Sequence, residues 1–193
     1  MRIFPKKNFI VLNDEALMRL VRQNRTAAFD ELYDRYSGHI YAFVSRMLSG
    51  NTEAARDLTQ DVFLRVVEKS DRYNPQYRFS SWIFTIAANL CRNEYRRQAV
   101  RKSDPLDETR LYAGQGNPER SADQRLFSAA LEQALNELRP SHRTVFLLRY
   151  QQDFSIGEIA SIAGCAEGTV KSRLHHVIKK LGHQLRDYEG LLE

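Results

Sequence analysis

The segment GCAEGTVKSRLHH, residues 164–176, combines a turn with a predicted helix whose polar face is cationic. After Glu167 no acidic residue occurs before Asp187. Phosphates flank a helix in the DNA major groove on both sides, which favours cations and hydrogen-bonding groups over carboxylates. The pattern therefore predicts a DNA recognition helix, with a helical hairpin that has a basic solvated face as the alternative. The candidate contacts are Thr169, Lys171, Ser172, Arg173, His175, His176 and Lys179.

The residues before this segment have helix-turn-helix spacing. Ile159, Ala160 and Ala163 form the inner face of a first helix, and small alanines let two helices cross closely. Gly164 takes the turn, where a positive φ is cheap only for glycine. Thr169 or Gly168 is expected to cap the second helix.

An acidic face is predicted around residues 57–64. Asp57 and Asp61 are four residues apart and Gln60 lies beside them, so the three share one helical face. The chain has a net charge of +5, and an acidic face in a basic protein is better suited to a basic protein surface than to DNA. Phe63 and Leu64 neighbour this face. The alternative is a solvated polar face with both apolar residues in the core.

A third group combines aromatic residues beside a loop with the cations that follow them. Exposed aromatic rings stack on bases and cations neutralise phosphates, so this combination is typical of single-stranded DNA binding. Trp82 and Phe84 also have helical core spacing, and we expect at least one of them to be buried. The candidate contacts are Tyr73, Tyr77, Phe79, Trp82, Arg92, Arg96 and Arg97.

Helices must position all three groups, because apolar residues recur at spacings of three and four along most of the chain and no hairpin strand pattern is present. Residues 100–122 contain two prolines, two glycines and few large apolar residues, which predicts a flexible linker. The predicted fold is all-α, with helical domains at 1–99 and 123–193 and the linker at 100–122.

Catalytic and membrane functions find no support in the sequence. Cys91 and Cys165 lie far apart and lack metal-ligand spacing, so no metal site or cofactor is expected. Asp57 and Asp61 have no third acidic ligand or phosphate-binding loop beside them, which argues against a nucleic-acid enzyme. No run of about 18 apolar residues predicts a membrane-spanning helix, and we expect no membrane insertion.

Four stretches, taken in order, resemble bacterial sigma factors of the extracytoplasmic-function class. AFDELYDRYSGHIYAFVSRML, NTEAARDLTQDVFLRVVEKSDRYN and FSSWIFTIAANLCRNEYRRQ resemble the promoter-opening domain. FSIGEIASIAGCAEGTVKSRLHHVIKKL resembles both the sigma-factor helix-turn-helix and that of response regulators, but residues 1–100 lack a receiver-domain pattern. A helix-turn-helix regulator that does not replace the sigma subunit remains the alternative.

The resemblance implies a role for each predicted surface. Asp57, Gln60, Asp61, Phe63 and Leu64 would dock on the clamp coiled coil of core RNA polymerase. The loop at 72–79 and the helix after it would hold the −10 promoter element, and residues 169–179 would read the −35 element. The resemblance also implies a cytoplasmic protein without enzymatic activity, and an anti-sigma factor that can hold it at the inner membrane.

Overall fold

The structure is a computed structural model that describes residues 9–101 and 122–186, and all regular elements within those ranges are helical. The predicted all-α fold is therefore confirmed. Most of the predicted linker, residues 102–121, lies outside the described residues. The elements are α1 (Asp14–Val21), α2 (Thr26–Met47), α3 (Thr52–Glu68), the 3-10 helix η2 (Ser70–Arg72), α4 (Phe79–Arg101), α5 (Ala122–Asn136), α6 (Pro140–Tyr150), α7 (Ile156–Ala163) and α8 (Glu167–Gln184).

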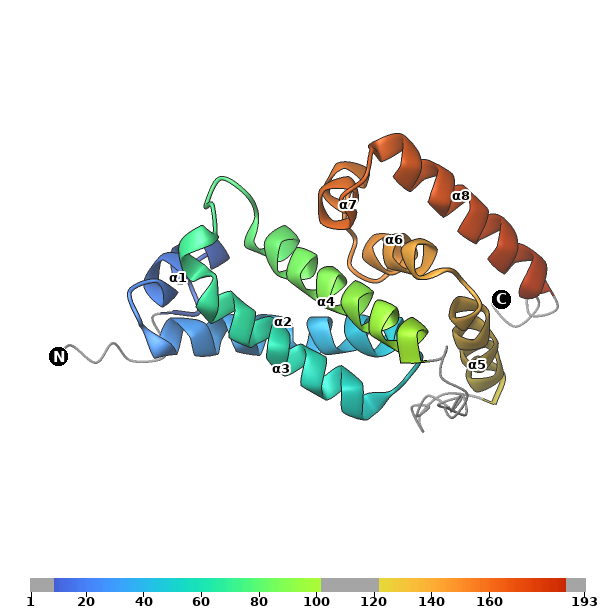
Figure 1. Ribbon diagram of the computed structural model, residues 1–193, viewed down its shortest axis with the longest axis horizontal. Coiled ribbons are helices and arrows are strands. Elements are labelled where there is room, and N and C mark those ends of the chain that lie inside the picture. The colour runs from blue at the N-terminus through green and yellow to red at the C-terminus, as the bar shows by residue number, and fades with distance from the viewer. Residues whose placement is uncertain (1–8, 102–121, 187–193) are drawn as a thin grey trace.

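Helices α1 to α4 pack together as the first unit (Figure 1). Asparagine caps begin two of them: the side chain of Asn13 accepts a hydrogen bond from the Ala16 amide at 2.9 Å, and that of Asn51 accepts one from Ala54 at 3.1 Å. The core between these helices is apolar, because residues three and four apart on each helix turn the same face inward. Its fully buried large side chains include Leu17, Met18, Leu32, Ile40, Phe43, Met47, Phe79, Ile83 and Phe84.

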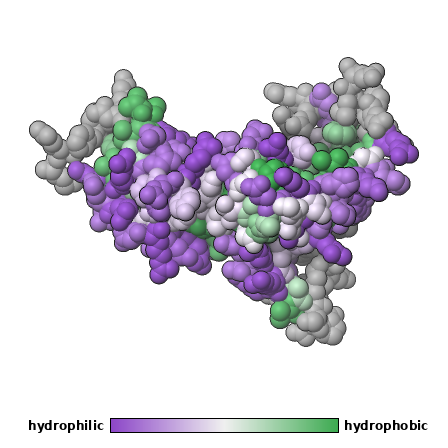
Figure 2. All heavy atoms as spheres, turned by 90° about the horizontal axis from the view of Figure 1, so that it is seen from above, coloured by the Kyte–Doolittle hydropathy of each residue, from purple (hydrophilic) through white to green (hydrophobic). Residues whose placement is uncertain are grey.

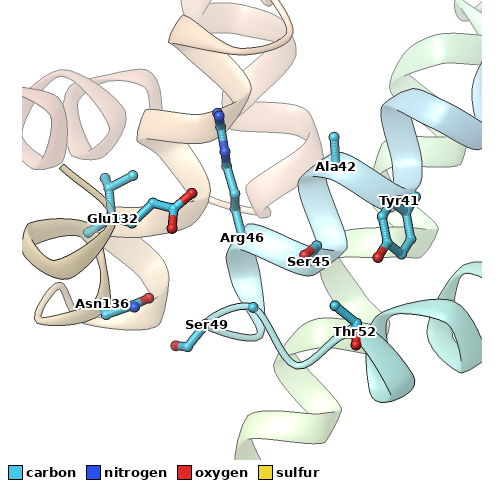
Figure 3. Close-up of a pocket in the computed structure, with 10 residues that line it drawn as sticks. Tyr41, Ala42, Ser45, Arg46, Ser49, Thr52, Glu132 and Asn136 are labelled. Carbon is cyan, nitrogen blue, oxygen red and sulfur yellow. The ribbon is translucent and has the colours of Figure 1, made fainter. Parts of the chain in front are cut away.

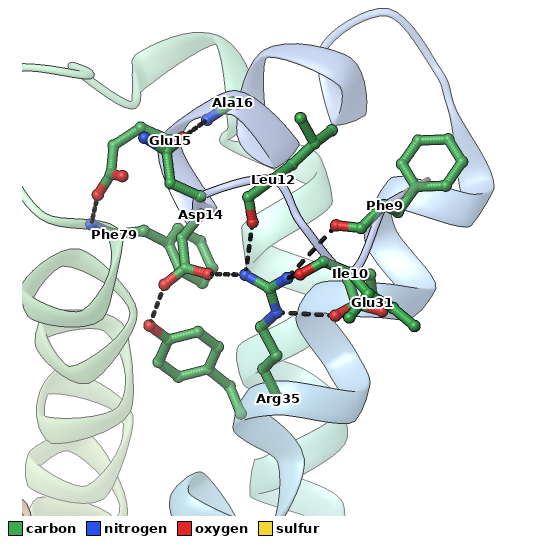
Figure 4. A network of polar contacts seen from close by, with 11 residues as sticks. Phe9, Ile10, Leu12, Asp14, Glu15, Ala16, Glu31, Arg35 and Phe79 are labelled. Carbon is green, nitrogen blue, oxygen red and sulfur yellow. Dashed lines mark hydrogen bonds and ion pairs between the residues drawn. The ribbon is translucent and has the colours of Figure 1, made fainter. Parts of the chain in front are cut away.

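A polar network centred on Arg35 of α2 holds the N-terminal segment in place (Figure 4). Its guanidinium donates to Asp14 at 2.7 Å, to Glu31 at 2.8 Å, and to three backbone carbonyls between residues 9 and 12. Next to Asp14, Glu15 accepts a hydrogen bond from the Phe79 amide at 3.2 Å. Phe79 is the first residue of α4, so its amide has no hydrogen-bond partner within the helix. The helix dipole also favours a carboxylate at this end. Helix α1 therefore fixes the start of α4.

Helices α5 to α8 form the second unit. A capping box begins α7: the Ser155 side chain accepts from the Glu158 amide, and the Glu158 carboxylate accepts from the Ser155 amide. Gly164 ends α7 in the left-handed conformation, with φ 64°, as the sequence predicts.

The two units meet along α4 and the end of α2, which contact α7 and α6 respectively. Figure 1 shows α6 and α7 between α4 and α8. The face of the molecule seen in Figure 2 is largely hydrophilic, and its hydrophobic atoms form separate small patches. The described structure therefore places the helix-turn-helix against the helix that the sequence assigns to promoter opening.

Candidate nucleic-acid interface

The predicted recognition helix is α8. It begins at Glu167 with Ala166 as its N-cap, two to three residues earlier than the cap predicted at Gly168 or Thr169. The earlier start follows from the turn, because Cys165 donates its amide to the Ala160 carbonyl at 3.0 Å and α8 begins directly afterwards. The residues that hold α8 against α6 and α7 are the buried Val170, Leu174, Val177 and Leu181.

The outward face of α8 carries four exposed polar side chains without a carboxylate among them: Lys171, Ser172, His175 and Lys179. Thr169, in the first turns of the helix, is exposed as well. Cations and neutral hydrogen-bonding groups on one helix face suit the two kinds of contact that a major groove offers, phosphates at its edges and base edges at its floor. The pattern seen in the sequence is therefore present on one surface.

Two predicted contacts on α8 are oriented differently. Nδ1 of His176 lies 2.8 Å from the Ser172 carbonyl oxygen and donates to it, and the His176 ring lies edge-on to His142 of α6 at 6.3 Å. Arg173 is half-buried, with Nη1 3.6 Å from the Cys165 sulfur. Burial and neighbouring cations lower the pKa of His142, so the ring facing His176 stays neutral over a wider pH range. His176 is exposed with its ring beside α6, and Arg173 lies beside the turn before α8, so both side chains are engaged within the protein.

The structure corrects two of the predicted single-strand contacts. Tyr73 is 3% exposed and Phe79 is fully buried, so neither ring offers a stacking surface to DNA. The Tyr73 hydroxyl donates to the Tyr77 carbonyl at 2.7 Å, and its ring lies 5.1 Å from that of Trp82. Burial raises the pKa of Tyr73 to about 12, which keeps this hydroxyl a donor. These aromatics anchor the loop instead, because a loop that leaves a helical core needs apolar contacts to fix its ends.

The remaining members of this group stay accessible. Tyr77 at the loop is 68% exposed, and Trp82 is half-buried. Along α4, Arg96 and Arg97 are exposed, and Arg97 pairs with Glu94 at 3.1 Å. Arg92 donates to the Ala163 carbonyl at 3.3 Å, across the boundary between the two units. Phe84 is buried, which confirms that at least one of the two aromatic residues at core spacing lies inside.

The acidic face on α3 is exposed at Asp57, Gln60 and Asp61. Leu64 extends it with a side chain that is 60% exposed. Phe63 is 3% exposed and lies against Tyr33 at 4.7 Å between ring centroids, so this predicted contact belongs to the core. Its position one residue before Leu64 turns it about 100° around the helix, toward α2 rather than outward.

The sequence analysis missed two apolar side chains next to this face. Tyr33 of α2 is 41% exposed and its ring covers Phe63. Val67 of α3 is 47% exposed. The signal for Val67 was present in the sequence, because a residue seven positions after Gln60 lies on the same helical face. Tyr33 could not be found in this way, since only packing brings α2 beside α3.

Within residues 9–101 and 122–186 no cluster of three His, Cys, Asp or Glu side chains could hold a metal ion. In the same ranges, no helix is long and apolar enough to cross a membrane. Cys91 is buried, and burial raises the pKa of its thiol to about 12, which leaves it unreactive near neutral pH.

An all-helical pair of units, one of them a helix-turn-helix with a cationic outer face, defines a class of DNA-binding transcription proteins. Two family profiles match within the chain, Sigma-70 region 2 over residues 32–101 and Sigma-70, region 4 over residues 128–181. The chain is 32% identical to the RNA polymerase sigma factor CarQ of Myxococcus xanthus, covering 89% of this chain and 97% of that protein. It is 30% identical to the ECF RNA polymerase sigma factor SigW of Bacillus subtilis, covering 88% and 95%.

Solved structures agree with this assignment. The sigma factor RpoE of Bartonella quintana, crystallised with the anti-sigma factor NepR, matches with a TM-score of 0.72 at 25% identity, over 82% of this chain and 96% of that one. CnrH in complex with the cytosolic domain of CnrY shares the fold, with a TM-score of 0.68 at 24% identity, over 90% and 97%. The chain therefore belongs to the ECF RNA polymerase sigma factors, a non-enzymatic family that directs promoter recognition. The resemblance stated from the sequence is confirmed.

Proposed function

We propose that the three surfaces divide promoter recognition in this sigma factor among themselves. The outward face of α8 reads the −35 element in the major groove. The observation that carries this assignment is the cluster of exposed Lys171, Ser172, His175 and Lys179 on a helix that holds no acidic residue after its first position. Each carboxylate on such a face would oppose the flanking phosphates, so its absence supports a DNA contact.

The −10 element binds on α4 and at the loop before it. Tyr77 offers an exposed ring for stacking, and Trp82 offers the accessible part of its ring. Arg96 is exposed and supplies a cation for the strand. Stacking and phosphate neutralisation together provide affinity for a single strand that has left the duplex.

Core RNA polymerase docks on α3 through Asp57, Gln60, Asp61 and Leu64, with the clamp coiled coil as the partner. An exposed leucine within an acidic surface favours a basic helical partner that also buries apolar area. Tyr33 and Val67 enlarge the apolar part of this surface. The protein acts in the cytoplasm and binds an anti-sigma factor; its similarity to RpoE, which was crystallised in complex with the anti-sigma factor NepR, supports this partner.

Run-off transcription tests these assignments together. Purified core RNA polymerase is mixed with this protein and fragmented genomic DNA, and the 5′ ends of the transcripts are mapped. We expect initiation at a restricted set of sites that share two sequence elements. Lys179→Ala should reduce initiation at all of them, whereas Arg19→Ala, which removes an exposed cation on α1, should not. Absence of transcripts above the level of core enzyme alone would contradict the proposal.

A further inference from the structure

The loop before α4 is exposed along its whole length. Residues 74–78 lie between η2 and α4, and each of them is exposed. The residues on either side of this loop, Tyr73 and Phe79, are buried. Fixing the backbone of each loop residue costs conformational entropy, and exposed side chains contribute little packing to offset that cost. The conformation of the loop therefore depends on its hydrogen bonds and on what holds its two ends.

Local hydrogen bonds give the loop its turn. The Asn74 carbonyl accepts from the Tyr77 amide at 3.1 Å, and the Asn74 side chain accepts from the Gln76 amide at 3.0 Å. Pro75 stands at the second position of this turn, where its fixed φ is favourable. These contacts set the shape of the turn, but they do not place it relative to the helical core.

Tyr73 places the turn relative to the core. Its ring packs against those of Phe79 and Trp82, with centroids 6.0 Å and 5.1 Å apart. Its hydroxyl donates to the Tyr77 carbonyl at 2.7 Å, on the other side of the turn. The Tyr77 backbone is thus tied to a buried ring, while the Tyr77 side chain stays 68% exposed.

Glu15 of α1 holds the other end of the loop. The carbonyl of Arg78 accepts the first hydrogen bond of α4, from the Trp82 amide at 3.2 Å, so Arg78 occupies the capping position. An arginine side chain has only donors and cannot accept from the free amides of the first turn, as a capping asparagine would. The Glu15 carboxylate supplies that acceptor, 3.2 Å from the Phe79 amide. Helix α4 is therefore capped by a residue of another helix, 64 positions away in the sequence.

Glu15 is itself held in place through its neighbour in α1. Asp14 accepts hydrogen bonds from the Arg35 guanidinium at 2.7 Å and from the Tyr36 hydroxyl (Figure 4). Burial raises the pKa of Tyr73 to about 12, and the nearby Glu15 and Asp14 carboxylates add to this effect. The two ends of the loop are therefore held by neighbouring groups that α1 and α2 fix in the core.

We propose that Glu15 and Tyr73 are positioning residues for promoter opening, which hold the loop at 74–78 in the conformation that receives the single strand before the strand arrives. The proposal rests on the assignment of the −10 element to α4 and this loop. Both residues act through the loop, because Tyr73 is 3% exposed and a carboxylate at Glu15 would oppose phosphates. A loop that is already ordered need not be ordered on binding, so apparent affinity follows the fraction of molecules with an ordered loop.

The variants remove one of these two anchors at a time in the full chain. Tyr73→Phe removes the hydroxyl and keeps the buried ring. Its matched control is Tyr41→Phe, because Tyr41 is in the same unit but lines a cavity of about 340 Å³ between the end of α2 and α5 (Figure 3). Glu15→Ala removes the acceptor, whereas Glu15→Gln keeps a side-chain oxygen that can accept from the Phe79 amide. Glu53→Ala, which removes a first-turn glutamate of α3, is the control for Glu15.

Trp82 reports on the loop without DNA. It is the only tryptophan in the chain, and its ring lies against that of Tyr73. Acrylamide quenching of its fluorescence should increase in Tyr73→Phe and in Glu15→Ala. Quenching in Glu15→Gln and in the two control variants should stay close to that of the wild type. Far-UV circular dichroism establishes that each variant is folded under the conditions used.

Fluorescence anisotropy measures binding of a short labelled single strand and a short labelled duplex, both of mixed sequence. Single-strand affinity should fall about three- to tenfold in Tyr73→Phe and Glu15→Ala, the population change that loss of one such hydrogen bond produces. Glu15→Gln should recover most of this loss. Duplex affinity should change by less than about twofold, and the salt slope of single-strand binding should stay the same, because no phosphate contact is removed. A purely structural defect would instead lower the affinities for single strand and duplex together.

Tyr77→Ala separates the positioning proposal from the assignment on which it rests, because it removes the exposed ring and leaves the carbonyl that Tyr73 contacts. If Tyr77→Ala weakens single-strand binding but the anchor variants leave single-strand affinity unchanged, the positioning proposal is wrong and the −10 assignment stands. Loss of affinity without increased quenching of Trp82 would also refute the proposal, since the loop would then be ordered without its anchors. If Tyr77→Ala too leaves single-strand affinity unchanged, the assignment of the −10 element to this loop fails.

Discussion

The outward face of α8 makes a prediction about which side chains carry sequence information. His175 and Lys179 are both exposed on this face, one helical turn apart. The N-terminal half of a recognition helix usually reaches the base edges, whereas cations further along meet phosphates. We therefore expect His175 to contribute to base preference and Lys179 to contribute affinity that is blind to sequence.

The expected magnitudes differ in kind. His175→Ala should cost about 1–3 kcal/mol at the base pair that it contacts and little elsewhere, which corresponds to a loss of roughly 5- to 150-fold for that base. Lys179→Ala should weaken all promoters equally and reduce the salt slope by about one unit. Between about 50 and about 200 mM salt, the affinity of Lys179→Ala for DNA should therefore fall by a factor roughly 3.5-fold smaller than that of the wild type.

His176 provides the matched control for this experiment. It is the neighbouring histidine on the same helix, but its ring nitrogen is engaged with the Ser172 carbonyl at 2.8 Å and its ring faces His142. His176→Ala should therefore change base preference much less than His175→Ala does. The assay is fluorescence anisotropy of the full chain with a duplex library that varies each position of the −35 element, at several salt concentrations. Uniform loss of affinity in all three variants, with base preference intact, would show that α8 lies along the backbone and does not read bases.

Three further predictions follow from the structure. Charge reversal in Asp57→Lys/Asp61→Lys should weaken binding to core polymerase in pull-down titrations without a change in helix content. Asp71→Lys, a charge reversal on the same unit outside this face, should not weaken it. Equal binding by both variants would place the docking surface elsewhere. Gly164→Ala should destabilise the chain by about 1–2 kcal/mol in urea unfolding because its φ is 64°, and a smaller loss for Gly164→Asn would support that cause. Because burial lowers the pKa of His142, the unfolded state takes up a proton at a higher pH than the folded state does. The free energy of unfolding should therefore fall as pH drops from about 7.5 to about 5.5, and His142→Gln should flatten that dependence.

Local sequence determined a large part of this protein. Helices repeat every 3.6 residues, so apolar spacing alone predicts an all-α chain and the faces of α3 and α8. Capping is equally local, because the Asn13 side chain accepts a hydrogen bond at the start of α1. Gly164, which has no side chain, adopts the positive φ that ends α7. The cationic face of α8 was also readable, because the absence of carboxylates after Glu167 does not depend on what the helix packs against.

Tertiary structure decided what periodicity leaves open. Tyr73 and Phe79 stand beside a loop, and the same pattern describes rings that stack on DNA and rings that anchor the loop. Tertiary packing buries both, with Tyr36 of α2 against Phe79 and Trp82 of α4 against Tyr73. Phe63 turns inward because α2 supplies the aromatic contacts that cover it.

Arg143 of α6, which is 2% exposed, is the clearest case. Nothing in the sequence around Arg143 distinguishes a solvated cation from a buried one. Its burial depends on the carbonyl of Met47 and the hydroxyl of Tyr95, which lie 96 and 48 residues away along the chain. Hydrogen bonds between such distant groups exist only once both units have folded and met, and this is why the burial of Arg143 is a property of the tertiary structure alone.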